Sequence, residues 1–323
     1  MRPLGRSGLR VGAHSFGGAQ LGNLGRSISD EDADQAVRAA WDQGVRYFDT
    51  APHYGLGLSE VRLGRALAQF PRNEYIVSTK VGRVLYPLTH KSQSLDEEFV
   101  VPKTHQRVLD YSRDGVLRSL DESLRRLGAE RIDIVLVHDP DQHFAEAMSG
   151  AFPALDELRR AGVIQSYGAG MNQASMLQSF VENTDLDIVM LANQHSLLRP
   201  RASLGLLDEA ERRNVSVVAA GVFNSGILAQ ARPDHQSHFD YKPASDEVLA
   251  AATNIANMCD RYQVPLPAAA AQFSLRHQAV ATVCLGSRMA SQVRRNDELF
   301  QLEIPDEFWR EFDELPPMTT SRP

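Results

Sequence analysis

The sequence predicts a (β/α)8 TIM barrel with a short N-terminal hairpin cap and active-site loops at the C-terminal face of its strands. Short runs rich in β-branched residues alternate with longer amphipathic stretches along the chain, which indicates parallel strands joined by crossover helices. Eight such units in 323 residues fit a closed barrel better than an open sheet. We therefore expect residues 1–323 to form a single barrel domain.

Eight apolar runs are the expected strands of this barrel. They are short, rich in Val and Ile, and bounded by turn-forming residues, as buried parallel strands are. They cover residues 14–16, 47–49, 75–79, 132–137, 164–167, 187–191, 215–219 and 281–285.

Helical patterns fill the intervals between these runs. One of the clearest begins at Asp30, places Ala33, Val37 and Ala40 on one face, and stops at Gly44, which is a common helix terminator. The others cover residues 58–70, 113–127, 151–161, 173–182, 205–214, 245–262, 267–277 and 291–299.

Two segments interrupt the alternation. Residues 5–8 contain two glycines between short apolar stretches and predict a small hairpin that caps one end of the barrel. Residues 84–107 follow the third expected strand, so we expect this long connection to lie over the active-site mouth. Polar side chains at residues 90–93 could bond substrate hydroxyls, while Phe99 and Val100 could close the site.

The composition excludes several classes of protein. With 34 basic and 41 acidic residues the formal charge is −7, so nucleic acid and anionic membranes are not expected partners. Cys259 and Cys284, the two cysteines, cannot form a disulfide framework. The N-terminal residues lack the apolar stretch of a signal peptide, and no apolar run is long enough to span a bilayer. We therefore expect a cytoplasmic protein.

Common nucleotide and metal motifs are missing. Gly55 and Gly57 are followed by Glu60 where a Rossmann fingerprint needs its third glycine. His138, Asp139, Asp141 and His143 could be read as a metal cluster, but Asp-Pro-Asp after a strand is ordinary turn chemistry. We expect no metal.

Ionisable residues stand where three of the expected strands end, namely Asp49, Lys80 and His138. The carboxyl ends of parallel barrel strands meet at one rim, so these side chains should converge there. One interpretation is a structural, buried Asp–Lys ion pair, since burying a charge is costly unless it is paired. Three such strand ends together favour a catalytic site.

The segment 48–55, with Asp49 and Tyr54, followed by Lys80 and His138 at strand ends, resembles the aldo-keto reductase family. The likeness extends over nearly the whole chain. It implies a (β/α)8 barrel that binds a nicotinamide cofactor without a Rossmann fold. It also implies that Asp49, Tyr54, Lys80 and His138 are the catalytic tetrad.

Carbonyl–alcohol interconversion explains these residue types. Tyrosine titrates near 10 and exchanges protons poorly at neutral pH. We expect the Lys80 ammonium to lower the pKa of Tyr54 and Asp49 to hold Lys80 in place. His138 can donate to the same substrate oxygen.

The resemblance also implies the cofactor contacts. Asn172 and Gln194 would bind the nicotinamide carboxamide and Asn296 the adenine. Gln292 stands where NADP-dependent relatives usually carry arginine, which favours NAD, although Arg288, Arg294 and Arg295 are near enough in sequence to keep NADP open. The remaining implied contacts are Gly221, Gly286, Ser287 and Arg288.

Segments 110–120 and 137–141 resemble the branch of the family that oxidises the anomeric hydroxyl of aldoses. The implied reaction converts a sugar such as L-fucose to a lactone by hydride transfer to nicotinamide. Oxidation of pyridoxal is the first alternative, followed by general aldehyde or ketone reduction. A non-catalytic, nucleotide-binding regulatory barrel is the last. The expected partner is a small sugar or aldehyde, and the oligomeric state stays open.

Overall fold

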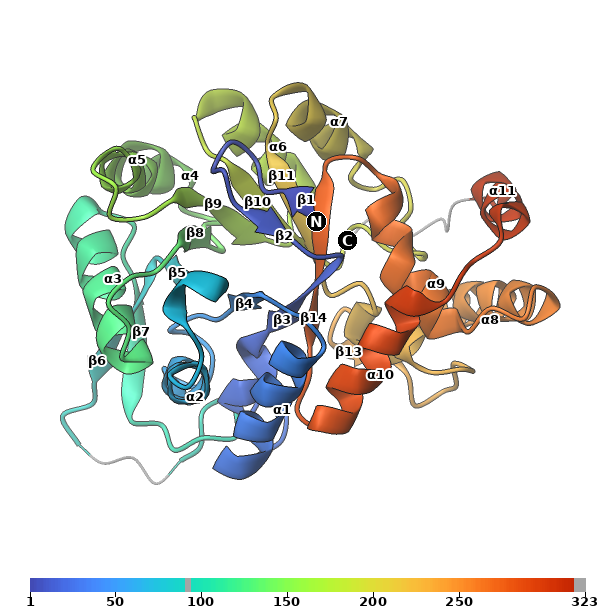
Figure 1. The fold of residues 1–323 in the computed structure, drawn as a ribbon, viewed down its shortest axis with the longest axis horizontal. Helices are drawn as coiled ribbons and strands as arrows, with labels where there is room; N and C mark the ends of the chain where they lie inside the picture. The colour runs from blue at the N-terminus through green and yellow to red at the C-terminus, as the bar shows by residue number, and fades with distance from the viewer. Residues whose placement is uncertain (91–93, 317–323) are drawn as a thin grey trace.

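Eight parallel strands close into a barrel in the computed structural model, which describes residues 1–90 and 94–316 (Figure 1). Going round the barrel, each strand pairs with the next, and β14 pairs with β3 to complete the circle. The strands are β3 (His14–Gly17), β4 (Tyr47–Asp49), β5 (Ile76–Val81), β8 (Ile134–His138), β9 (Ser166–Met171), β10 (Ile188–Ala192), β11 (Ser216–Ala220) and β14 (Val280–Gly286). The predicted fold class and all eight expected strands are confirmed.

Helices cover the outside of the barrel (Figure 1). Helix α1 begins after Ser29, whose hydroxyl accepts from the Asp32 amide while the Asp32 carboxylate accepts from the Ser29 amide, a reciprocal cap. The nine expected helices are present as α1 (Asp30–Asp42), α2 (Leu58–Leu67), α3 (Arg113–Leu127), α5 (Phe152–Arg160), α6 (Ala174–Asn183), α7 (Leu204–Arg212), α8 (Asp246–Arg261), α9 (Leu266–Phe273) and α10 (Ala290–Gln301). The structure adds α4 (Phe144–Glu146) and α11 (Asp306–Glu314), which the sequence analysis missed. None of the described helices is long and apolar enough to cross a membrane.

The N-terminal hairpin closes one end of the barrel. Strands β1 (Arg2–Pro3) and β2 (Arg10–Val11) pair antiparallel. Arg2 donates to the carbonyl of Val280 at the start of β14, at 2.7 Å, and the Gly5 amide donates to Ser216 Oγ at the start of β11, at 2.6 Å. The hairpin therefore covers the N-terminal ends of the strands, as predicted, and leaves the C-terminal ends to the loops.

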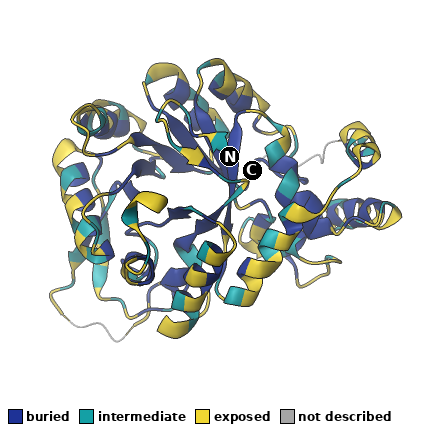
Figure 2. Ribbon diagram, in the orientation of Figure 1, coloured by how far each residue is buried: buried dark blue, intermediate teal, exposed yellow. Residues whose placement is uncertain are grey.

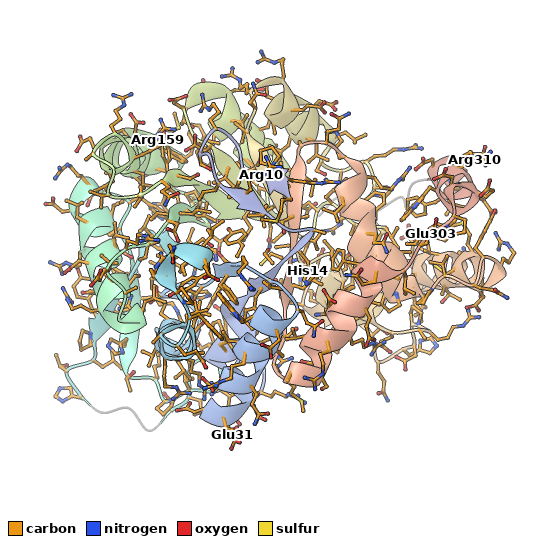
Figure 3. The ribbon with its side chains drawn as sticks, in the orientation of Figure 1. Arg10, His14, Glu31, Arg159, Glu303 and Arg310 are labelled. Atoms are coloured by element: carbon orange, nitrogen blue, oxygen red, sulfur yellow. The ribbon has the colours of Figure 1, made fainter. Side chains whose placement is uncertain are left out.

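Apolar side chains fill both layers of the fold. Figure 2 shows buried residues along the strands and exposed residues on the outer faces of the helices, and Figure 3 shows Glu31 and Arg310 pointing outward from two of those helices. Inside the barrel, Ile134, Leu136, Ile188 and Val218 pack together and are fully buried.

The connection at 84–107 is more ordered than the long loop that the sequence predicts. Its flanks pair as an antiparallel hairpin of β6 (Arg83–Pro87) and β7 (His105–Leu109). Beyond these strands the chain folds back against the loop after β3: the Val100 amide donates to the Asn23 carbonyl at 2.9 Å, and Asn23 Nδ2 donates to the Val100 carbonyl at 3.1 Å.

Candidate active site

Three neighbouring strands, β4, β5 and β8, bring the predicted site residues together. Lys80 Nζ lies 2.6 Å from Asp49 Oδ2 and 3.0 Å from the Tyr54 hydroxyl, and both charged side chains are almost completely buried. Lys80 also donates to the Thr50 carbonyl at 3.1 Å. The ammonium therefore joins Asp49 to Tyr54 at the C-terminal rim.

Asp49 is fixed from a second side, because Ser78 Oγ donates to its Oδ1 at 2.6 Å. Burial by itself would lower the pKa of Lys80, but Asp49 and Tyr54 outweigh this effect and raise the pKa above its ordinary value. Lys80 is therefore a permanent cation, held between a carboxylate and a phenol.

The Tyr54 hydroxyl is a weaker acid than an ordinary tyrosine. Burial raises the pKa of Tyr54 to about 12, and the nearby Lys80 ammonium opposes this shift without cancelling it. The predicted effect of Lys80, which lowers the pKa of Tyr54, is present, but burial outweighs it. The physical reason is that the phenolate loses more hydration in this buried position than the ammonium returns.

His138 completes the predicted group. Its ring stands edge-on to Tyr54, with 5.9 Å between ring centroids and 89° between planes. Burial, followed by the positive charge of Lys80, holds the pKa of His138 well below its ordinary value. The imidazole is therefore neutral near pH 7 and can donate a hydrogen bond from one nitrogen.

An ion pair flanks His138. Asp139 Oδ2 lies 3.4 Å from His138 Nε2 and 2.9 Å from Arg83 Nη2, and the Tyr111 hydroxyl donates to the carbonyls of both His138 and Asp139. Within the described residues no three His, Cys, Asp or Glu side chains are grouped so that they could hold a metal ion. Asp139 pairs with Arg83 and lies beside the His138 ring.

The sequence analysis missed His53 and Glu98. The His53 ring lies 5.5 Å from that of His138, and its Nε2 lies 3.2 Å from Glu98 Oε2. The signal available in the sequence was a polar residue directly before Tyr54. Phe99, which we expected to lie over the site, is next to Tyr54. The centroids of the two rings are 6.2 Å apart, and the Phe99 ring stands edge-on to His53. Of the polar residues expected nearby, His90 is exposed and 91–93 lie outside the described residues.

Four of the expected cofactor residues meet where β14 leads into α10. Asn296 Nδ2 donates to Ser287 Oγ at 3.1 Å, and the Arg288 amide donates to Gln292 Oε1 at 2.8 Å. The Arg288 guanidinium donates to the Leu24 carbonyl at 2.5 Å. This places a cation and the start of a helix side by side, and helix N-termini bind phosphate groups.

Helix α10 is held against the barrel by His14, labelled in Figure 3. The His14 ring stacks on Phe300 of α10 with 4.7 Å between centroids, and its Nε2 lies 3.5 Å from Asp297 Oδ1. The C-terminal half of α10 is therefore fixed relative to β3.

The region around Gly286 fits a nicotinamide dinucleotide. A Cβ at Gly286 would lie 2.0 Å from Gln20 Oε1, and that oxygen is buried with no hydrogen-bond partner. An unsatisfied buried acceptor in a native fold usually has a partner in a water or a ligand, and the cofactor amide and ribose hydroxyls are donors of the required kind.

Asn172, Gln194 and Gly221 follow β9, β10 and β11, so the structure places them at three adjacent strand ends. Gly221 has φ +63°, and a Cβ there would come within 2.4 Å of Asn193 Oδ1. This close approach and left-handed backbone require glycine.

Known proteins match this chain closely. The Aldo/keto reductase family model covers residues 15–316. The chain is 42% identical over 312 residues to D-threo-aldose 1-dehydrogenase of Pseudomonas sp, and 42% identical over 326 residues to pyridoxal 4-dehydrogenase of Microbacterium luteolum; each match covers 95% of both proteins. An aldo-keto reductase from Bacillus halodurans in its holo form has a TM-score of 0.73 at 24% identity, covering 96% of this chain and 94% of that one.

Proposed function

Because the chain belongs to the aldo/keto reductase family and is an NAD(P)-dependent oxidoreductase, we propose that it oxidises the anomeric C1 hydroxyl of an aldose such as L-fucose to a lactone. The single observation that carries the proposal is the continuous contact from Asp49 through Lys80 to the Tyr54 hydroxyl, at 2.6 and 3.0 Å. A related aldose dehydrogenase at 42% identity supports the substrate class.

The tetrad moves the proton of this reaction. Tyr54 takes the proton of the C1 hydroxyl as the C1–H hydride leaves and the C1–O bond becomes a carbonyl. Lys80 stabilises the negative charge that Tyr54 would carry before accepting that proton, and Asp49 keeps Lys80 in position. Neutral His138 donates a hydrogen bond to the substrate oxygen and stabilises the negative charge that develops on that oxygen during the reaction. The nicotinamide, when bound, supplies the hydride acceptor.

Asn172, Gln194 and Gly221 would hold the nicotinamide end, and Gly286, Ser287, Arg288, Gln292 and Asn296 the adenine and phosphate end. This division is supported by the strand-end positions of the first group and by the cation and helix start in the second.

Pyridoxal oxidation is the second candidate, favoured by the equally similar pyridoxal 4-dehydrogenase. Both substrates are cyclic hemiacetals and would use the same four residues. General aldehyde or ketone reduction by the same four residues is the third candidate.

One assay tests the proposal. The protein is incubated with NAD or NADP and a panel of L-fucose, other aldoses and pyridoxal, and formation of reduced nicotinamide is followed by its absorbance. We expect turnover with at least one aldose. Turnover with pyridoxal alone supports the second candidate, and absence of turnover with every aldose and with pyridoxal contradicts both.

We expect NAD to be preferred, and Gln292→Arg to shift kcat/KM toward NADP. The new guanidinium could pair with a 2′-phosphate, and a charge-assisted hydrogen bond contributes at most roughly 1.5–3 kcal/mol. The gain should be smaller, because the variant loses the contact from the Arg288 amide to Gln292. Steady-state kinetics with both cofactors decides this, and a wild-type preference for NADP contradicts it.

The tip of the β6–β7 hairpin should help select the substrate. Replacing residues 88–104 with an Asn-Gly turn joins Pro87 to His105, which already face each other across the hairpin. Removing Phe99 from beside Tyr54 should raise KM for the sugar about tenfold or more, with a much smaller change in the Kd of the cofactor. Unchanged sugar kinetics in the folded variant shows that the tip plays no part in selection.

A further inference from the structure

His53 has a buried hydrogen-bonding atom that nothing in the protein satisfies. The residue is only 7% exposed, and its Nδ1 is buried without a hydrogen-bond partner. Buried polar atoms of native proteins are nearly always paired, and the exceptions call for a functional explanation. The tetrad chemistry described above does not use this atom.

The contact with Glu98 fixes which nitrogen of His53 carries the proton. Burial lowers the pKa of His53, and the hydrogen bond with His53 lowers the pKa of Glu98, so the ring is neutral and the carboxylate ionised near pH 7. An ionised carboxylate only accepts, so Nε2–H donates to Glu98 Oε2 across 3.2 Å. Nδ1 then carries a lone pair and needs a donor.

The ring lies beside the reacting groups. Its centroid is 5.5 Å from that of His138 and 6.1 Å from that of Tyr54. Phe99 also stands edge-on to the His53 ring, with 5.3 Å between centroids. The His53 ring therefore lies beside the two side chains that would contact the reacting oxygen.

The backbone around Glu98 is held in this position by hydrogen bonds. The amide of Gly25 donates to the Glu98 carbonyl at 3.3 Å, and the Asp96 carboxylate accepts two hydrogen bonds from Arg107, at 2.6 and 3.1 Å. Arg107 also donates to the His53 carbonyl at 3.1 Å, so one guanidinium joins the hairpin tip to the residue that precedes Tyr54.

We propose that His53 Nδ1 accepts a hydrogen bond from a hydroxyl on the carbon next to the reacting carbon, so that the enzyme selects 2-hydroxy aldehydes and their cyclic forms, the aldoses. The inference rests on the proposed function, since it places the reacting oxygen at Tyr54. It names the part of the substrate that His53 and Glu98 recognise: the hydroxyl at C2 of an aldose. His53 is a specificity-determining residue, and Glu98 positions it by fixing its tautomer.

Two short substrates test the inference on the wild-type protein. Reduction of 2-hydroxypropanal and of propanal is followed with NADH or NADPH, because these aldehydes differ only in the hydroxyl. We expect kcat/KM to be about 10- to 100-fold higher for the hydroxylated aldehyde, since a site built to bond a hydroxyl rejects the analogue that lacks it. A ratio near one overturns the proposal without any variant.

A matched pair of variants isolates the Nδ1 atom. The terminal amide of asparagine reaches the position of a histidine Nδ1, whereas that of glutamine reaches the position of Nε2. His53→Asn should keep most of the preference for the hydroxylated aldehyde, and His53→Gln should bring the ratio close to one. Equal ratios in the two variants overturn the assignment of Nδ1. The Kd of the cofactor, measured by fluorescence quenching, verifies that each variant is folded and binds cofactor.

Failure of this inference is distinguishable from failure of the proposed function. The ratio is measured in the reductive direction on aldehydes, so it remains measurable if no aldose is oxidised. Conversely, oxidation of L-fucose together with an equal rate for 2-deoxy-L-fucose retains the proposed function and overturns the role of His53.

Discussion

Tyr54→Phe should lower kcat for the native substrate by at least about 10²-fold, the scale of lost acid–base catalysis. The variant keeps the ring between His138 and Phe99 and removes only the hydroxyl that lies 3.0 Å from Lys80 Nζ. The Kd of the cofactor should change little. Tyr262→Phe, which removes a hydroxyl bonded to Glu311 far along the chain, is the matched control and should turn over normally.

The pH profile gives the same hypothesis a second test. Because burial raises the pKa of Tyr54 to about 12, only a small fraction of the free enzyme carries the phenolate at neutral pH. Below the pKa, that fraction grows about tenfold for each unit by which the pH rises. We therefore expect kcat/KM for oxidation to rise through the alkaline range as long as the fold is intact. The rise should be absent from the residual activity of Tyr54→Phe. Near-normal turnover by that variant means that Tyr54 does not transfer the proton.

The site residues that could be predicted from sequence are those whose position follows from a single strand. Asp49, Lys80 and His138 each end an apolar run, and the parallel barrel forces such ends onto one rim. Tyr54 required the family resemblance, because it lies in the loop after β4, where no periodicity marks a residue. The eight strands were predictable from the same apolar runs, because short buried segments with few polar residues, bounded by turn residues, are typical of parallel strands.

The missed features depend on contacts between distant segments. His53 and Glu98 are 45 residues apart in sequence, and they meet because Arg107 and the Asn23–Gly25 loop fix the hairpin tip. The net pKa shift of Tyr54 was not predictable because burial and the Asp49 carboxylate raise the pKa while the Lys80 ammonium lowers it. The sequence shows that the charge exists but not how completely the phenol is buried.

Lys80→Met should abolish most activity and also destabilise the fold, because it leaves the Asp49 carboxylate buried without its cation. Two side chains, Ser78 and Lys80, donate to the Asp49 carboxylate. In the variant the Ser78 hydroxyl would be the one that remains. Breaking a buried ion pair by removing one partner costs roughly 3–5 kcal/mol, which urea unfolding monitored by circular dichroism can measure.

The double variant Asp49→Asn/Lys80→Met separates the structural role of the pair from its catalytic role. A neutral amide in place of the carboxylate removes the unpaired buried charge, so most of the lost free energy of unfolding should return. Turnover should stay as low as in Lys80→Met, because Tyr54 still lacks the ammonium that stabilises its phenolate. If activity recovers together with stability, the Asp49–Lys80 pair is a structural ion pair and the proton chemistry at Tyr54 does not need it.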